Sequence, residues 1–419
     1  MATELSWVTS SKLGRSRCDA RWAGLWLSVA LAALLTGCGA PGARWQSVST
    51  DARGSFFGLG GQTTPVLALS ADPQITGLIY VGAAGAGVRR ITANGGGVEA
   101  SGPGMAQDSS VFSLTPDPGV LGAIYAGAST GFYVSTDAAA SWQSRNAGLP
   151  TDGAITAIAT GPHGSPLLAG TERHGLFLSA DQGATWRPAV GGLPADGRVA
   201  TALWVERDKT ALVAFTDGHL YTSQEALQDW TRRDTGLPTD GGVQALAASA
   251  DARAVYAGTT HGLYASEDAG ATWAGVAGGL PSGSVGALTS DPLQPSAIYA
   301  AVENRVYAST DGARTWSALA DALDKPASAI AVTANRERSP VTYATTGQLY
   351  RYPGLAGGTP LAPVIVALLA AAVILFLFIR SRRMRHARPT SSSATPPSGP
   401  SDTRSPAERY GDADEMTSS

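Results

Sequence analysis

The chain has 419 residues, and its composition excludes some classes of protein. The formal net charge is −3 and only 15% of the residues are charged, which gives no electrostatic case for binding nucleic acid. The only two cysteines, Cys18 and Cys38, precede the repeated part of the chain, so that part contains neither a disulfide nor a thiolate metal site. A chain of this length can form one large all-β domain or two small domains, and no metal or cofactor is expected.

The first 37 residues have the pattern of a signal peptide. Basic residues precede an apolar run at 22–35, which is short for a membrane-spanning helix but usual for a signal peptide. The run ends in Leu-Thr-Gly-Cys at 35–38 and resembles a bacterial lipobox. This resemblance implies that Cys38 is lipidated and becomes the new N-terminus. The alternative is an ordinary signal sequence followed by an accidental cysteine.

The C-terminal part of the chain predicts a membrane-spanning helix. Residues 361–379 form an uncharged run of 19 residues, long enough to cross a bilayer. Five arginines follow within 380–388, whereas the preceding flank offers only Arg351. The positive-inside rule then places the tail, residues 380–419, in the cytoplasm and everything before the helix outside. The tail is rich in Ser, Thr and Pro, and we expect it to be disordered.

Between these ends the sequence repeats with a period of about 44 residues. The clearest marker is a box of the form Ser-x-Asp-x-Gly-x-Thr-Trp, of which SADQGATW at 179–186 is the fullest copy. Three more copies and a worn one, SQEALQDW at 223–230, keep the spacing. An upstream aromatic residue and a Gly-Leu-Pro triplet keep the same period. Self-similarity at this period is typical of the blades of a β-propeller.

Each repeat predicts four short strands. Residues 243–277 show this best, because small and apolar residues alternate there with β-branched and aromatic ones between turn signals. Seven such units begin near residues 65, 109, 153, 197, 241, 284 and 328. The last unit lacks its fourth strand, and residues 44–48, with Trp45 in the place of a box tryptophan, are predicted to supply it. Such closure removes free sheet edges.

The predicted fold is therefore all-β, a seven-bladed propeller closed by an N-terminal strand and followed by one transmembrane helix. The expected domains are a signal peptide at 1–37, a short tether at 38–44, the propeller at 45–356, the helix at 361–379 and the tail at 380–419.

The box residues are interpreted as scaffold. The aspartate lies in the tight turn between the third and fourth strands, where its carboxylate can accept backbone N–H groups. A glycine supplies a positive φ where one is needed, and the tryptophan packs against the neighbouring blade. The residues assigned to this role are Ser135, Asp137, Trp142, Ser179, Asp181, Gly183, Trp186, Ser266, Asp268, Gly270, Trp273, Ser309, Asp311, Gly312 and Trp316.

These boxes resemble the Asp-box, or bacterial neuraminidase, repeats over residues 45 to about 353. Such repeats occur in sialidases, xyloglucan-cleaving glycosidases, the sortilin luminal domain and the photosystem II assembly-factor propellers. The resemblance implies the fold but says little about function, because one propeller architecture carries unrelated activities. The assembly-factor propellers are similar in size and imply a non-catalytic module that binds protein. They lack the C-terminal helix and tail predicted here, and this chain lacks the disulfide-rich modules of sortilin.

The chain lacks the residues that a sialidase would need. That family implies an Arg-Ile-Pro motif in the first blade, and the nearest match, Arg-Ile-Thr at 90–92, lacks the proline and falls on a predicted third strand. Glycosidases generally need two carboxylates that face each other, and nothing in the sequence pairs Glu172, Asp217 and Glu303. We therefore expect no enzymatic activity. A glycan-binding or glycoside hydrolase protein with a diverged active site is the alternative.

Strand topology places both predicted anchors on one side of the propeller. Trp45 and Tyr352 should leave the ring close together, on the face of the Asp-box turns, and their tethers reach at most about 25 to 32 Å. The opposite face, formed by the turns between second and third strands and by the links between blades, then points away from the membrane. This outward face is the predicted binding surface, with Glu172, Arg173, His174, Asp217, His219, His261, Glu303 and Arg305.

The three histidines of the outward face leave two interpretations open. In the first interpretation, the histidines form a ligand site. Ordinary turn chemistry is favoured, because His174 and His261 precede glycine and His219 is one place out of register with them. The sequence thus predicts a non-catalytic protein-binding or assembly module in a bacterial cell membrane, with its propeller outside. The expected partners are the membrane and an envelope protein, with a glycan as the alternative ligand.

Overall fold

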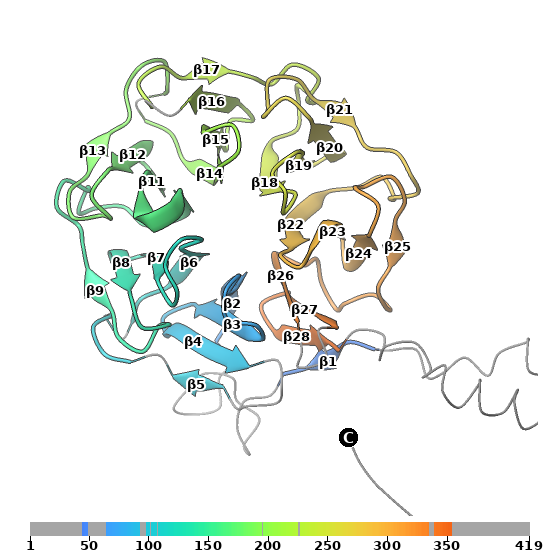
Figure 1. Ribbon diagram of the computed structural model, residues 1–419, viewed down its shortest axis with the longest axis horizontal. Coiled ribbons are helices and arrows are strands. Elements are labelled where there is room, and N and C mark those ends of the chain that lie inside the picture. The colour runs from blue at the N-terminus through green and yellow to red at the C-terminus, as the bar shows by residue number, and fades with distance from the viewer. Residues whose placement is uncertain are drawn as a thin grey trace, which may run out of the picture. The chain divides into compact units, whose positions relative to one another are not determined.

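The computed structural model describes residues 44–48, 64–92, 98–100, 102–106, 108–194, 196–224, 227–334 and 339–353. These residues form seven four-stranded antiparallel sheets, which confirms the predicted seven-bladed all-β propeller (Figure 1). The predicted signal peptide, Cys38, the apolar segment 361–379 and the tail lie outside the described residues. Within those residues, no helix is long and apolar enough to span a membrane.

The first four blades follow one another along the chain. Blade 1 contains β2 (Val66–Ala71), β3 (Leu78–Ala83), β4 (Gly87–Thr92) and β5 (Glu99–Ala100). Blade 2 contains β6 (Val111–Pro116), β7 (Ile124–Ala128), β8 (Gly131–Ser135) and β9 (Gln143–Ser144). Blade 3 contains β10 (Ile155–Thr160), β11 (Leu167–Thr171), β12 (Leu176–Ser179) and β13 (Arg187–Pro188), with a short 3₁₀ turn, Pro162–Gly164. Blade 4 contains β14 (Val199–Val205), β15 (Thr210–Phe215), β16 (Leu220–Gln224) and β17 (Thr231–Arg232).

The last three blades complete the ring. Blade 5 contains β18 (Val243–Ala248), β19 (Val255–Thr259), β20 (Gly262–Ser266) and β21 (Ala274–Gly275). Blade 6 contains β22 (Val285–Asp291), β23 (Gln294–Val302), β24 (Arg305–Ser309) and β25 (Ser317–Ala318). Blade 7 contains β26 (Ala329–Ala334), β27 (Pro340–Thr345), β28 (Leu349–Tyr352) and β1 (Gln46–Ser47).

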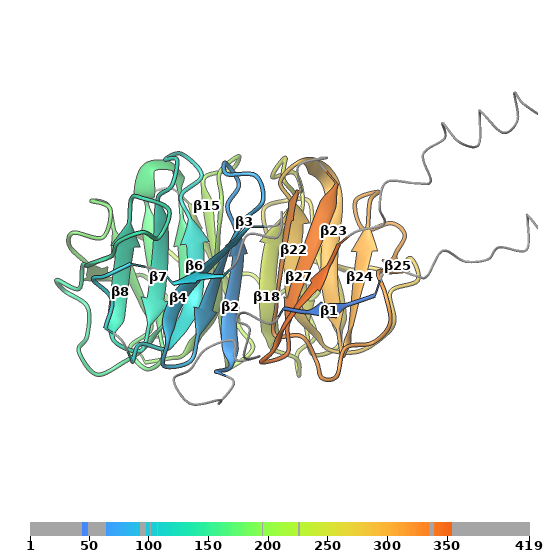
Figure 2. The same ribbon diagram turned by 90° about the horizontal axis from the view of Figure 1, so that it is seen from below.

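The seventh blade joins the two ends of the described chain. Strand β1 pairs antiparallel with β28, with Gln46 opposite Arg351, and the Val48 amide donates to the Leu349 carbonyl at 2.9 Å. The Trp45 and Tyr352 rings lie 5.6 Å apart between centroids. Figures 1 and 2 show β1 beside the orange strands of this blade, although it comes from the opposite end of the sequence.

Burial explains which strands are apolar. The second strand of a blade is covered on both faces by neighbouring blades, and every residue of β3, β7, β11, β15 and β19 is buried. Glycine lets the blades approach at this strand. A Cβ on Gly170 would lie 2.5 Å from Val199 Cγ1 of the next blade, and the second-strand glycines of blades 1, 2 and 5 are equally crowded. The glycine that recurs in the second strand of these blades therefore reflects close packing between blades.

A β-bulge recurs at the start of the innermost strand. The pairing register shifts between the first and third residues of the first strand in blades 1 to 6, as between Ile155 and Ala157. Such a bulge leaves one residue unpaired and re-aims its side chain. The innermost strands of neighbouring blades contact each other around the whole ring, including β26 with β2. The bulged residues thus belong to the strands that surround the centre of the propeller.

Candidate functional site

The Asp-box turn of blade 3 forms a closed hydrogen-bond network within eight residues. The Ser179 hydroxyl donates to Asp181 Oδ1 at 2.7 Å and accepts the Gly183 amide at 2.9 Å. The Thr185 amide donates to Asp181 Oδ1 at 2.9 Å, and the Thr185 hydroxyl donates to Asp181 Oδ2 at 2.6 Å. Hydrogen bonds from the side chain and backbone of Thr185 lower the pKa of Asp181 to about 2. Both carboxylate oxygens are therefore engaged in holding the turn.

The other three boxes repeat this network with different residues. Blades 2, 5 and 6 use Ser135 with Asp137, Ser266 with Asp268, and Ser309 with Asp311, in the same donor and acceptor roles. Each turn has two successive residues with positive φ, where the sequence predicted a role for glycine alone. In blade 2 both are alanines, Ala138 (φ 56°) and Ala139 (φ 63°). The hydrogen bonds thus hold a backbone shape that L-residues adopt only with strain.

Each box tryptophan packs against the blade that precedes its own. Trp186 of blade 3 lies edge-on to Phe132 of blade 2 at 4.8 Å, and its Nε1 donates to the Arg145 carbonyl at 3.0 Å. Its backbone amide donates to the Ala147 carbonyl at 2.8 Å. The next residue, Gly148, begins a Gly-Leu-Pro triplet, and a Cβ there would lie 2.1 Å from the Trp186 carbonyl. In three of the four triplets, at Gly148, Gly192 and Gly236, the glycine therefore marks the place where one blade's link crosses the next blade's tryptophan.

The worn box of blade 4 keeps the tryptophan, and its described residues form a different turn, in which the Leu227 amide donates to the Gln224 carbonyl at 2.8 Å. Trp230 is 5% exposed and packs with the blade 3 leucines at 168, 176 and 178. Its Nε1 has no hydrogen-bond partner in the structure. The buried Ser223 hydroxyl, at the position of Ser179, makes only one contact within the described residues, with the Gln224 carbonyl at 3.5 Å. Packing between blades is thus separable from the hydrogen bonds of the turn.

The outward face lies on the side of the propeller that the antiparallel order of the strands predicts. The candidate residues occupy the turns between second and third strands of four consecutive blades, 3 to 6: Glu172, Arg173 and His174; Asp217 and His219; His261; Glu303 and Arg305. The links between blades arrive on the same side. This face carries no group of three or more His, Cys, Asp or Glu residues that could hold a metal ion, as far as the described residues extend.

Each of the three outward-face histidines is paired with an aspartate. His174 Nε2 lies 3.0 Å from Asp152 Oδ1, and His261 Nε2 lies 3.5 Å from Asp240 Oδ2. Both aspartates follow a Gly-Leu-Pro triplet in the link that enters the same blade. His219 differs, because its Nδ1 lies 3.1 Å from Asp234, which follows the fourth strand. The Thr-Asp-Gly after two of the triplets was the sequence signal for these pairs, and sequence reasoning missed it.

The remaining outward-face residues divide into anchored and free side chains. Asp217 accepts the His219 amide at 3.0 Å, and Glu303 accepts the Ser284 amide at 3.0 Å, so both carboxylates brace their own loops. Arg173 and Arg305 are exposed, and neither forms an ion pair with another described residue. These two guanidinium groups are available to a partner.

A central cavity of about 220 Å³ lies among the innermost strands of all seven blades. Its lining includes the bulged residues Phe112, Thr156, Ala200, Gln244 and Gly286. All eighteen lining residues are apolar, hydroxyl-bearing, amide-bearing or glycine. Because the bulges lie at the beginning of each first strand, where the links enter, the cavity is on the side of the outward face.

The sequence matches no known family model. No curated protein matches it significantly. Solved structures with a similar fold include a GH74 xyloglucanase from Xanthomonas campestris, with 20% identity and a TM-score of 0.58, covering 76% of this chain and 54% of that one. An ancestral GH74 enzyme has 17% identity and a TM-score of 0.55, over 68% of this chain and 44% of the enzyme.

A sensory protein has a similar fold as well. The extracellular domain of a protein described as a hybrid two-component system from B. thetaiotaomicron has 15% identity and a TM-score of 0.55, over 74% of this chain and 40% of that one. The chain spans about half the length of the xyloglucanase and less of the other two. At these identities the likeness concerns the fold alone.

Proposed function

We propose that this protein is an extracytoplasmic, membrane-anchored propeller that binds another protein through its outward face and catalyses no reaction. The observation that carries the proposal is the exposure of Arg173 and Arg305, on blades 3 and 6, without an ion pair among the described residues. Arginine is a preferred residue in protein interfaces, because its planar guanidinium pairs with carboxylates and stacks on aromatic rings.

The loops that carry these arginines are rigid enough to present them. Histidine–aspartate pairs tie the turns of blades 3, 4 and 5 to the neighbouring link or strand end. The Ser284–Glu303 bond does the same in blade 6. A preorganised surface loses less side-chain and loop entropy on binding.

The central cavity supports binding over hydrolysis. A glycoside hydrolase needs two carboxylates beside the bond that it cleaves. The described residues that line the cavity offer hydroxyl and amide groups with apolar side chains between them, and none of them is a carboxylate. Such a mouth suits a partner loop that makes hydrogen bonds and buries an apolar side chain, for example against Phe112, which is 37% exposed.

Membrane anchoring on the Asp-box side is part of the same proposal. Trp45 and Tyr352 lie side by side, at 5.6 Å between ring centroids, at the end of blade 7 that corresponds to the Asp-box turns. We propose that β1 acts as the clasp of the ring, and that the lipidated Cys38 and the helix at 361–379 hold this side toward the membrane. The outward face then remains free.

The test is capture of a partner by the tagged full-length protein from crosslinked membranes, read by mass spectrometry. We expect one reproducible envelope protein, lost from the double variant Arg173→Glu/Arg305→Glu. The matched control is Arg187→Glu/Arg314→Glu, which reverses two exposed arginines outside the outward face and should keep the partner. Equal capture by both double variants would contradict binding through this face.

Glycan binding is the second candidate function. The observation that favours it is the similarity of the fold to a solved GH74 xyloglucanase and to another solved GH74 enzyme. Incubation of the full-length protein with xyloglucan oligosaccharides tests it through retention on the glycan and through release of new reducing ends. Either result, together with no captured protein, would replace the protein-binding proposal.

A further inference from the structure

Two leucine side chains are exposed on the Asp-box side of the propeller. Among the described residues, the exposed large hydrophobic side chains are Phe112, Leu121, Val190 and Leu293. Phe112 lines the central cavity, and Val190 lies in the link that follows β13, on the outward side. Leu121 is 67% exposed and Leu293 is 52% exposed, in the turns between the first and second strands of blades 2 and 6. The antiparallel strand order puts these turns on the same side as the Asp-box turns.

The turns of blades 1, 2 and 6 bury the one charged residue that each contains. Each turn begins with an Asp-Pro pair, and the aspartates, Asp72, Asp117 and Asp291, are 4%, 1% and 3% exposed. Asp117 accepts the Tyr125 hydroxyl at 2.7 Å, and Asp291 accepts the Leu293 amide at 2.8 Å. The residues that follow the aspartates carry no charge. We call these segments, 73–76, 118–122 and 292–296, the uncharged turns.

Both leucine turns are braced by the Asp-box turn of their own blade. In blade 2 the Ala138 amide donates to the Gly122 carbonyl at 2.7 Å. In blade 6 the Gly312 amide donates to the Ser296 carbonyl at 2.9 Å, and the Ser296 hydroxyl donates to the Thr310 carbonyl at 2.8 Å. Because the backbone beside each leucine is fixed, presenting the side chain to a partner costs little loop entropy.

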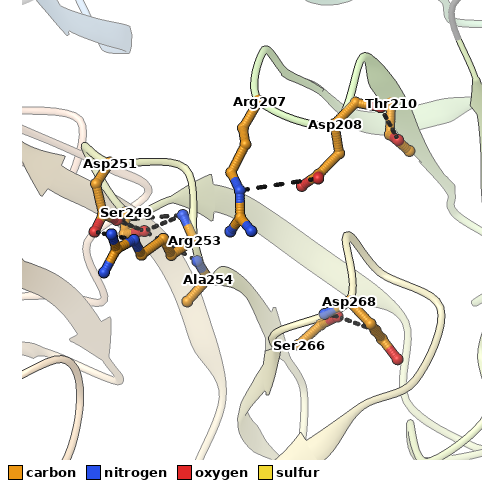
Figure 3. A network of polar contacts seen from close by, with 9 residues as sticks. All are labelled: Arg207, Asp208, Thr210, Ser249, Asp251, Arg253, Ala254, Ser266 and Asp268. Atoms are coloured by element: carbon orange, nitrogen blue, oxygen red, sulfur yellow. Dashed lines mark hydrogen bonds and ion pairs between the residues drawn. The ribbon is translucent and has the colours of Figure 1, made fainter.

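The corresponding turns of blades 4 and 5 carry exposed charges instead. Figure 3 shows the Arg207 side chain directed to Asp208, with an N–O distance of 4.0 Å, and Arg253 beside Asp251 at 3.5 Å. All four of these residues are exposed. Contacts between the innermost strands place blades 6, 7, 1 and 2 in succession around the ring. The charged turns therefore lie on a different part of the Asp-box side from the two leucines.

Both predicted anchors are attached to blade 7, between blades 6 and 1. Cys38 precedes Arg44 by six residues, and the apolar segment 361–379 begins eight residues after Pro353. Extended chains of these lengths reach at most about 22 and 29 Å. The turn of blade 7 at 335–338 lies outside the described residues. A single exposed leucine is ordinary on a protein surface. Here, however, both exposed leucines of the Asp-box side belong to the part of the ring that is attached to the anchors.

We infer that the propeller contacts the lipid bilayer through the uncharged turns, with Leu121 and Leu293 inserted at the membrane interface. The inference rests on the proposed function, in which Cys38 and the helix at 361–379 anchor the Asp-box side, and adds a direct contact between the folded ring and lipid. Insertion removes apolar side chains from water, which is favourable. The charged turns of blades 4 and 5 stay in water, because burial of a charge is costly. The ring is therefore tilted, with blades 4 and 5 farther from the bilayer.

The experiment places the fluorophore NBD on single introduced cysteines of the full-length protein in phosphatidylcholine vesicles. The test positions are Leu121→Cys and Leu293→Cys, and the exposed controls are Val190→Cys on the outward side and Ala250→Cys in the turn of blade 5. The unsubstituted protein, labelled in the same way, gives the signal of the native cysteines. Lipids with a nitroxide near the headgroup then quench any fluorophore that they contact. We expect quenching of at least about two-fold at positions 121 and 293 and almost none at 190 and 250, because interfacial side chains lie about 5 to 10 Å deep.

Three outcomes would overturn the inference. The first is equal quenching at positions 121, 293 and 190, which would show no specific contact with lipid. The second is quenching at position 250 as strong as at the leucine positions, which would show that the ring is not tilted onto the uncharged turns. The third is an emission shift to shorter wavelength at positions 121 and 293 without quenching, which would indicate that protein, such as a second copy of this chain, covers the leucines.

Failure of this contact is distinguishable from failure of the proposed function. Retention of the protein in membranes washed with alkaline carbonate measures the anchoring by itself. Partner capture that depends on Arg173 and Arg305 measures binding through the outward face. Either result can hold when the labels at positions 121 and 293 are not quenched, and only the contact between the ring and lipid would then be wrong.

Discussion

The Asp-box turn of blade 5 and the worn turn of blade 4 are neighbours in the ring and hold their strands differently. In blade 5 the Ser266 hydroxyl donates to Asp268 and accepts the Gly270 amide, and Trp273 Nε1 donates to the Arg233 carbonyl at 3.0 Å. In blade 4 the tryptophan is equally buried, yet Trp230 Nε1 has no partner, and among the described residues Ser223 contacts only the Gln224 carbonyl, at 3.5 Å. The difference shows that the tryptophan alone suffices to pack two blades, whereas the aspartate shapes the turn. A blade can therefore change the turn of its box without leaving the ring.

The largest expected effect is the loss of a box tryptophan. Trp273→Ala removes a large buried ring and should lower the free energy of unfolding by about 3 to 5 kcal/mol. Trp230→Ala should cost about 1 kcal/mol less, because it breaks no indole hydrogen bond. Urea unfolding of both full-length variants, followed by circular dichroism, gives the difference. A larger loss of stability for Trp230→Ala than for Trp273→Ala would contradict this difference between the two blades.

Substitution of the buried serines by alanine should distinguish the stabilities of the two turns most clearly. Ser266→Ala leaves the Gly270 amide and the Asp268 carboxylate without their partner, which we expect to cost about 1 to 2 kcal/mol. Ser223→Ala removes a buried hydroxyl whose one contact with a described residue is 3.5 Å long, and we expect it to cost less than Ser266→Ala. The same unfolding measurement compares the two variants, and equal losses of stability would contradict this difference between the turns.

A smaller effect is expected from the strained alanines of blade 2. Ala138 has φ of 56°, and the equivalent first position in blade 6 is Gly312, where a Cβ would meet nothing within 4 Å. Ala138→Gly should raise the free energy of unfolding by less than about 1 kcal/mol, since relief of strain exceeds the added entropy of the unfolded chain. The control Ala265→Gly, in strand β20, should instead lower it by about 1 kcal/mol. A destabilised Ala138→Gly variant would argue against strain in this turn.

The smallest expected effect is the loss of stability at low pH, because the box carboxylates are exposed and screened by solvent. Burial tends to raise the pKa of Asp268, but hydrogen bonds from the Thr272 side chain and backbone and from Ser266 outweigh it and hold the pKa at about 2. Since the pKa is lower in the folded state than its ordinary value of 3.8, the contribution is complete above about pH 4 and is lost as the pH falls toward 2. The difference in stability between the native protein and Asp268→Asn should therefore shrink between pH 4 and pH 2. A constant difference over this range would contradict the role of the carboxylate.

The fold could be predicted because its signals are local and repeated. The four strands of a blade are close in sequence, so the 44-residue period, the box and the alternation of apolar residues indicated both the number of blades and their boundaries. The first strands begin at Val66, Val111, Ile155, Val199, Val243, Val285 and Ala329, within two residues of the predicted starts. The outward face followed from the antiparallel order of the strands. The candidate residues of this face lie in or beside the turns between second and third strands, but their partners were not predicted.

The candidate sites depended on contacts that the repeat does not encode. The aspartates that hold His174 and His261 come from links on the far side of two strands, so local spacing did not connect them. The bulges that direct Phe112 and Gln244 toward the centre shift the register by one residue and leave no clear mark in the sequence.

The sequence by itself thus determined the number of blades, the course of each blade's strands and the shape of each Asp-box turn, because these depend on residues within one repeat. Only the tertiary structure decided which charges remain unpaired, where the cavities open and which blade each tryptophan covers. The physical reason is distance along the chain. Hydrogen bonds within eight residues are fixed by local geometry, whereas packing between blades is settled only when the ring brings separate repeats together.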